Sequence, residues 1–167
     1  VDNFKGGYMA TKHLIEAGYK KIAFIGGIEN SNSTIERLEG YKHAFKEYNR
    51  KIQKSHIVYG DYTYNSGYLN MKKLMSTENL PDAAFAVSDF NALAALEYIE
   101  ELGLSVPEEF GIIGFDNVGF AAFPQIQLST ISQPKYQIGK YAAEALINSI
   151  KNETTKFMQS IILEPEL

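Results

Sequence analysis

Cysteine is absent from the 167-residue chain, which excludes disulfides, thiolate nucleophiles and cysteine-based metal sites and permits a reducing compartment. No basic block is present either: the formal net charge is −4 and the lysines and arginines are scattered, so this segment alone is not expected to bind DNA. The longest apolar runs, such as DAAFAV at 82–87, are too short to cross a bilayer, and no charged-then-apolar leader opens the chain. A composition that is 45% hydrophobic and 13% aromatic at this length is typical of one soluble globular domain.

Residues for catalysis or metal binding are also few. The three histidines, His13, His43 and His56, fall on expected helices or at a strand start, where we expect packing or surface roles. No histidines and carboxylates cluster at metal-ligand spacing, and spacing fixes no acid–base pair. The stretch AFIGGIENSNS, 23–33, fits neither common phosphate-loop pattern and is a weak signal. We therefore predict no catalytic residue, no metal and no cofactor.

Strand and helix patterns alternate along the chain. A helical pattern ends at Gly18, and a fourth expected strand, EFGIIGFD, ends at Asp116. The stretch from Asn117 to Pro134, which contains Gly119 and Pro124, is expected to be a loop or crossover. The pattern predicts an α/β fold, a doubly wound parallel sheet with helices on both faces. Its expected strands lie within residues 20–27, 55–61, 82–89, 109–116 and 156–167, and the last strand follows a helix with a wide apolar stripe over 138–150.

Residues that follow parallel strands meet at one edge of a sheet, where such folds hold ligands. Asp116 could accept two hydroxyl hydrogen bonds there, or it could cap the next loop. Tyr62 could stack on a sugar or a base, or pack within its loop. Arg37 could bind hydroxyl pairs or a carboxylate, although solvated helical arginines are commoner. Asp61 and Asp89 fit turn and helix-cap positions better than ligand positions.

Five segments in order carry a family resemblance over essentially the whole chain. They are VDN with GGYMATKHLIEAGYKKIAFIGG, then ERLEGYKHAF, GDYTYNSGY, LPDAAFAVSDFNALAALEYIEELGLSVPEEFGIIGFDN and LSTISQPKYQIGKYAAEALI. Together they resemble the effector-binding core of LacI/GalR-type bacterial transcription regulators. The resemblance implies a two-lobed, periplasmic-binding-protein-like fold of type I, of which this chain is mainly the C-terminal lobe.

The resemblance also implies site residues. Arg37 in RLEGY matches the family's effector arginine, Asp116 in GFDN its acidic ligand, and Tyr62 after GD its stacking aromatic. Ser33 and Gln133 fall at positions that can line the cleft. The residues expected to bind the effector are thus Arg37, Tyr62, Asp116, Ser33, Gln133 and Ser88. Ser88 stands where many family members carry asparagine, and its side chain is shorter and has one hydrogen-bond donor.

By the same resemblance, residues 20–132 and a return strand in 153–167 belong to the C-terminal lobe. Residues 1–19 and 133–152 are expected to be helices of the N-terminal lobe, and the DNA-binding headpiece is absent. The apolar stripe of the second helix would then face nothing, and we expect these helices to repack, to pair with another copy or to fray.

The expected function is that of the ligand-sensing domain of a LacI-type repressor, without enzymatic activity. Its expected partners are a sugar, sugar phosphate or purine effector, a second copy of the chain, and operator DNA through the headpiece only. We expect the protein to be cytoplasmic and not to bind membranes. The expected homodimer strip contains Leu93, Leu96 and Tyr98, unless the two leucines face the sheet as core residues. A substrate-binding protein of a sugar importer is the alternative.

Overall fold

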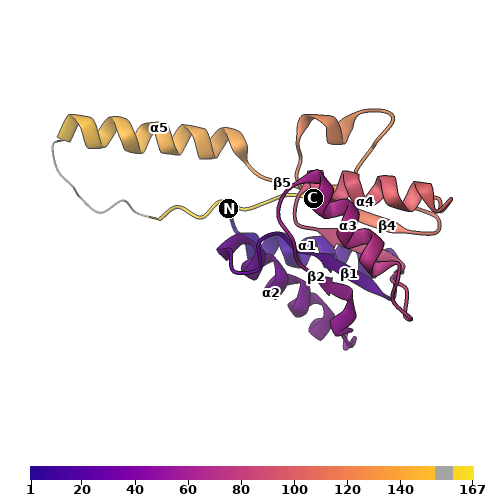
Figure 1. Cartoon of the computed structure of the whole chain (residues 1–167). Coiled ribbons are helices and arrows are strands. Elements are labelled where there is room, and N and C mark those ends of the chain that lie inside the picture. Colours follow the sequence, from indigo (N-terminus) through magenta and orange to yellow (C-terminus); the bar gives the residue numbers. More distant parts are fainter. Residues whose placement is uncertain (153–159) are drawn as a thin grey trace.

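A computed structural model describes residues 1–152 and 160–167 and consists of a sheet between two layers of helices, from which one further helix projects (Figure 1). All neighbouring strands pair in parallel, in the order β2-β1-β3-β4-β5. The strands are β1 (Ile22–Ile25), β2 (Ile57–Val58), β3 (Ala83–Ala86), β4 (Gly111–Asp116) and β5 (Thr130–Ser132). The α-helices are α1 (Asn3–Glu16), α2 (Asn32–Glu47), α3 (Tyr64–Leu74), α4 (Asp89–Glu101) and α5 (Lys135–Asn152), and two 3-10 turns span Lys54–His56 and Gly119–Ala122. The predicted α/β class and parallel sheet are confirmed.

Alternate residues of the strands point to opposite faces of the sheet and pack into two separate hydrophobic cores. Phe24, Phe85 and Phe115 pack in one core beneath α1 and α2. Ala84 and Ile112 pack in the other core, beneath α3 and α4. Because both faces of the sheet are covered, β1 and β3 are buried at every position, which explains their uninterrupted apolar runs.

The fifth strand lies in a different segment from the one we predicted. The structure places β5 at Thr130–Ser132, inside the expected loop, where it pairs with the end of β4 and buries Ile131 completely. Within 160–167, the predicted return strand is reduced to an antiparallel bridge between Glu166 and Ser132. The first part of that predicted strand, 153–159, lies outside the described residues. A strand of three residues is too short to show an alternating pattern, so pairing with β4 defines it.

Helix α1, which was expected to dock on another lobe, packs against α2 and the sheet in this structure. Two glycines allow the close contact: a Cβ on Gly7 would lie 2.2 Å from the carbonyl oxygen of Arg37, and one on Gly40 would lie 2.1 Å from that of Phe4. The backbones of the two helices therefore touch directly.

Helix α5 leaves the end of β5 and extends away from the layers (Figure 1). Its large apolar side chains remain open to solvent, including Tyr136, Leu146, Ile147 and Ile150. Among the described residues, no helix is both long and apolar enough to cross a membrane.

Candidate functional site

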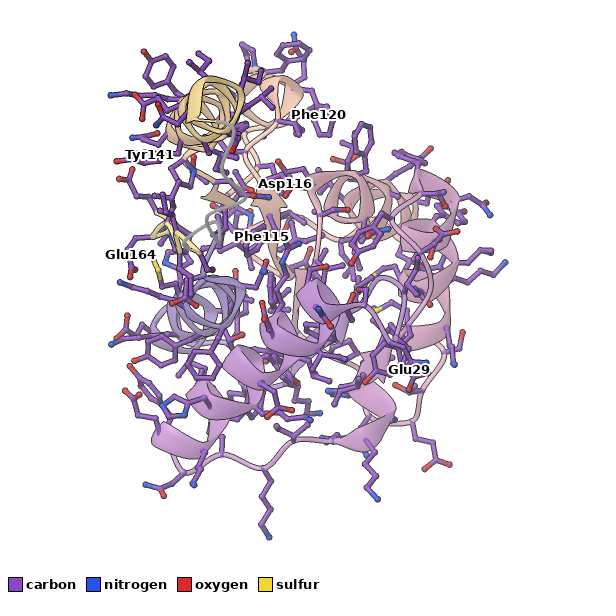
Figure 2. The ribbon with its side chains drawn as sticks, turned by 90° about the vertical axis from the view of Figure 1, so that its left-hand side faces the viewer. Glu29, Phe115, Asp116, Phe120, Tyr141 and Glu164 are labelled. Atoms are coloured by element: carbon purple, nitrogen blue, oxygen red, sulfur yellow. The ribbon has the colours of Figure 1, made fainter. Side chains whose placement is uncertain are left out.

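The carboxyl ends of β1, β3, β4 and β5 bring several predicted residues to one edge of the sheet. Figure 2 shows Asp116 at the end of β4, beside Phe115 and below α5. A groove of about 470 Å³ opens at this edge between α2 and α5. Three of the predicted residues, Ser33, Arg37 and Gln133, line it together with apolar side chains of α5, whereas the lining does not include Asp116, Tyr62 or Ser88. A larger hollow of about 730 Å³ lies at the amino end of β4 and contains none of the predicted effector residues.

Arg37 is buried, although solvated arginines on helices are commoner. Its guanidinium carbon lies 3.5 Å from the centre of the Phe115 ring, and Nε donates to Asn3 Oδ1 at 3.0 Å. The same guanidinium also donates to the carbonyl oxygen of Val87. Burial lowers the pKa of Arg37, an effect opposed by the nearby charge of Asp116. Stacking and hydrogen bonds thus hold a cation in one orientation at the groove.

Asp116 combines an unusual backbone with a partly buried carboxylate. Its φ is 112°, and Asn117 follows with a φ of 53°, so two residues in succession lie in the left-handed region. Gln133 Nε2 donates to Asp116 Oδ1 at 2.5 Å, whereas Oδ2 has no hydrogen-bond partner within the described part of the chain. Burial raises the pKa of Asp116, and the hydrogen bond from Gln133 and the charges of Arg37 and Lys135 oppose that rise. One carboxylate oxygen is therefore available to accept a ligand hydrogen bond.

The Asp116→Asn variant is expected to be at least as stable as the wild type at neutral pH. Because burial raises the folded-state pKa of Asp116, its neutral form contributes stability below the ordinary pKa, and that contribution is lost as pH rises through the raised value. Asparagine avoids this loss and can still accept the bond from Gln133. Urea unfolding should show an advantage of the variant at about pH 7 that shrinks toward about pH 4. An advantage that grows on acidification would contradict this assignment.

Tyr62 lies at the same edge of the sheet, where its hydroxyl contacts three side-chain hydroxyls and its ring contacts Gly27. Its hydroxyl lies 2.9 Å from Ser31 Oγ, 2.8 Å from Ser33 Oγ and 3.0 Å from Thr34 Oγ1. Its ring covers Gly27, where a Cβ would lie 2.6 Å from the ring. Burial acts to raise the pKa of Tyr62, but the three hydroxyls and the charge of Arg37 outweigh it, so the pKa falls below its usual value. Tyr62 is thereby linked to the groove through Ser33.

The structure does not bring Ser88 to the groove. Ser88 is 4% exposed and caps α4, accepting from the Asn91 backbone N–H and donating to Asn91 Oδ1. Asp61 has the turn role that we expected, whereas Asp89 does not cap α4, because Ser88 is the N-cap and the Asp89 carboxylate accepts from Val118 and Thr130. Asp61 accepts from Thr63, and Asp89 lies in the first turn of α4.

Sequence reasoning missed Asn3. Its side chain accepts from Arg37 and donates to Glu36, so it joins the start of α1 to the arginine of the groove. No spacing rule could have indicated it, because the two positions are distant in the chain and meet only when α1 docks on α2. The described residues hold no cluster of three or more histidines and carboxylates suited to a metal ion.

The expected homodimer strip on α4 needs a correction at Leu96. This side chain is 8% exposed and belongs to the core beneath α3 and α4, because it lies on the same helix face as the fully buried Ala92 and Ile99. Leu93 and Tyr98 remain partly exposed. The ring of Tyr98 packs edge-on against Tyr68 of α3, with centroids 5.2 Å apart.

Comparisons with known proteins match the whole chain. The model of the periplasmic binding protein-like domain matches residues 11–167. The HTH-type transcriptional repressor PurR of Actinobacillus pleuropneumoniae serotype 3 (strain JL03) is 41% identical, over 100% of this chain and 50% of that protein. The ribose operon repressor of Haemophilus influenzae (strain ATCC 51907 / DSM 11121 / KW20 / Rd) is 37% identical, over 96% of this chain and 48% of that protein.

Among solved structures, the complex of the transcriptional regulator CelR with cellobiose is 35% identical and has a TM-score of 0.87. The match covers 93% of this chain and 47% of the CelR chain. The chain therefore spans about half the length of the curated relatives it matches.

Proposed function

Because the chain belongs to the periplasmic binding protein-like domain family, with LacI-type repressors among its relatives, we propose that it is the effector-sensing part of such a repressor. The observation that carries the proposal is a fixed guanidinium that lines the groove, together with a nearby carboxylate that is bonded to Gln133 of the same groove. Arg37 is locked on Phe115, and Asp116 keeps one oxygen available. A ligand with hydroxyls or ring nitrogens could be bound by both groups.

We place the effector in the class of sugars, sugar phosphates or purines. The apolar part of the groove, formed by side chains such as Ile138 and Tyr141, suits a ring, and the charged groups suit its polar edge. The CelR structure contains cellobiose, and another LacI-family neighbour is complexed with phosphate, so ligands of this chemistry bind related folds.

The proposed action is binding without chemistry. An effector would favour one arrangement of the intact parent over another only through its different affinity for the two. Operator DNA would be bound by a separate headpiece in the cytoplasm. A substrate-binding protein of a sugar importer is the less favoured alternative, since the named relatives are repressors.

Calorimetric titration of the chain with D-ribose, cellobiose and adenine tests the proposal. At least one probe should bind saturably to the wild type and about tenfold or more weakly to Asp116→Asn, because the charged acceptor is lost. Failure of all three probes to bind, or equal affinity in the variant, would refute the proposed site. Consumption of a probe would favour an enzyme instead.

We also propose that the outer face of α4 pairs two copies. Tyr98 and Leu93 lie there, beside the exposed Phe90 and Leu102. Tyr98→Glu should shift the sedimentation coefficient toward the monomer, because a carboxylate would be buried at the interface. The matched control Ile35→Glu, on the opposite layer in α2, should sediment as the wild type does. An unchanged coefficient in Tyr98→Glu would contradict the interface.

A further inference from the structure

We infer that Asp89 is a positioning residue that fixes the backbone following β4 and thereby holds Asp116 beside Gln133, which lines the groove. The inference rests on the proposed function, since it concerns how the same site is built. Asp89 is fully buried, and Oδ2 accepts from the backbone N–H of Val118 at 2.7 Å. Its other oxygen, Oδ1, accepts from Thr130 Oγ1 at 2.5 Å. One carboxylate on α4 therefore joins the segment after β4 to the start of β5.

Thr130 extends this connection by one residue. Its hydroxyl oxygen accepts a hydrogen bond from the backbone N–H of Asn117 at 3.2 Å, and the same hydroxyl donates a hydrogen bond to Asp89. Both amides that follow Asp116 are thus tied, directly or through Thr130, to the same carboxylate.

These hydrogen bonds are made by the amides that follow Asp116, at a segment whose backbone has unfavourable positive φ values. Asp116 and Asn117 have φ values of 112° and 53°, and residues other than glycine reach this region only at a cost in conformational energy. Without the bonds, the segment would relax toward ordinary φ values and carry the Asp116 carboxylate with it. The bonds from Asp89 and Thr130 oppose that relaxation.

The surroundings of Asp89 are shaped to hold it. A Cβ on Gly114 of β4 would lie 2.3 Å from Asp89 Oδ1, so only glycine leaves room for the carboxylate at this position. Leu128 and Ala92 lie against the same glycine. Burial in this apolar setting raises the pKa of Asp89, and the bonds from Thr130 and Val118 counter the rise. The carboxylate lies at the first turn of α4, where the helix dipole favours a negative charge.

Two variants test the inference against a matched control. Asp89→Asn keeps the shape but replaces one acceptor oxygen with an NH2 group, so the side chain can no longer accept from both Val118 and Thr130, and Thr130→Val removes the hydroxyl alone. The control is Asp82→Asn, because Asp82 also accepts from two backbone amides, those of Lys20 and Lys21, at the opposite end of the sheet. Backbone amide exchange and urea unfolding are measured for each, with calorimetric titration of D-ribose, cellobiose and adenine.

Amide exchange at Asn117 and Val118 should accelerate about tenfold more than global unfolding accounts for in both test variants, and not in the control. Affinity for the probe that binds the wild type should fall about tenfold in the same two variants. Unchanged exchange at these amides would overturn the inference and leave the proposed function intact. Faster exchange with unchanged affinity would show that Asp89 does not position Asp116 for binding. A wild type that binds none of the probes overturns the proposed function itself.

Discussion

Replacing Gly40 with alanine is expected to destabilise the fold by about 3 kcal/mol, a large share of the stability of a small domain. The new Cβ would lie 2.1 Å from the carbonyl oxygen of Phe4 and 2.5 Å from the backbone nitrogen of Tyr8. Both are backbone atoms of α1, which no side-chain rotation can move aside. The helices must separate, and the packing of α1 on α2 and on the sheet is lost with them.

Gly139→Ala is the matched control, because within the described residues no atom outside the adjoining turns of α5 lies within 4 Å of a Cβ at this position. Alanine is the better helix former, so this variant should be neutral or more stable by up to about 1 kcal/mol. Urea unfolding followed by circular dichroism compares the two. Equal midpoints for Gly40→Ala and the wild type would contradict the direct contact between α1 and α2.

Replacing Arg37 with methionine is expected to weaken effector binding by about a hundredfold or more. The free energy of unfolding should fall only modestly. Methionine retains an apolar contact with Phe115 but removes the hydrogen bonds to Asn3 and Val87 and the positive charge at the groove. Unfolding free energy should fall by about 1–2 kcal/mol, the scale of a lost cation–π contact and hydrogen bonds.

Arg50→Met provides the comparison for Arg37, since Arg50 likewise donates to a backbone carbonyl, that of Tyr19. It should lose comparable stability and bind D-ribose, cellobiose or adenine as the wild type does. Full probe affinity in Arg37→Met, or equal losses in both variants, would show that Arg37 has a structural role only.

Parts of this account were predictable because they depend on local patterns. The apolar run that ends at Asp116 predicted β4 and its position at the sheet edge, and the order of strands and helices predicted the fold class. The burial of Arg37 was not predictable by spacing, because it depends on Phe115 of β4 and on Val87, which follows β3. Helix α1 joins this layer through glycines in two helices whose contact no single segment reveals.

Other differences arise where local patterns are ambiguous. The spacing of α4 allowed Leu96 to face either the sheet or a partner, and packing beneath α3 and α4 placed it in the core. Ser88 follows a strand, as a ligand residue would, yet its hydroxyl completes the cap of α4. A position at the strand end therefore identifies candidates, and hydrogen-bond partners distinguish those that remain available.

The measurement that tests the central claim most directly is a two-dimensional amide NMR titration of the chain with D-ribose, cellobiose and adenine. NMR detects weak binding and locates it at the same time. We predict saturable shifts at Ser33, Tyr62, Asn117 and Gln133, around the groove, which in Asp116→Asn require about tenfold or more ligand to reach saturation. Shifts confined to the hollow at the amino end of β4, or no shift with any probe, would contradict a ligand site built on Arg37 and Asp116.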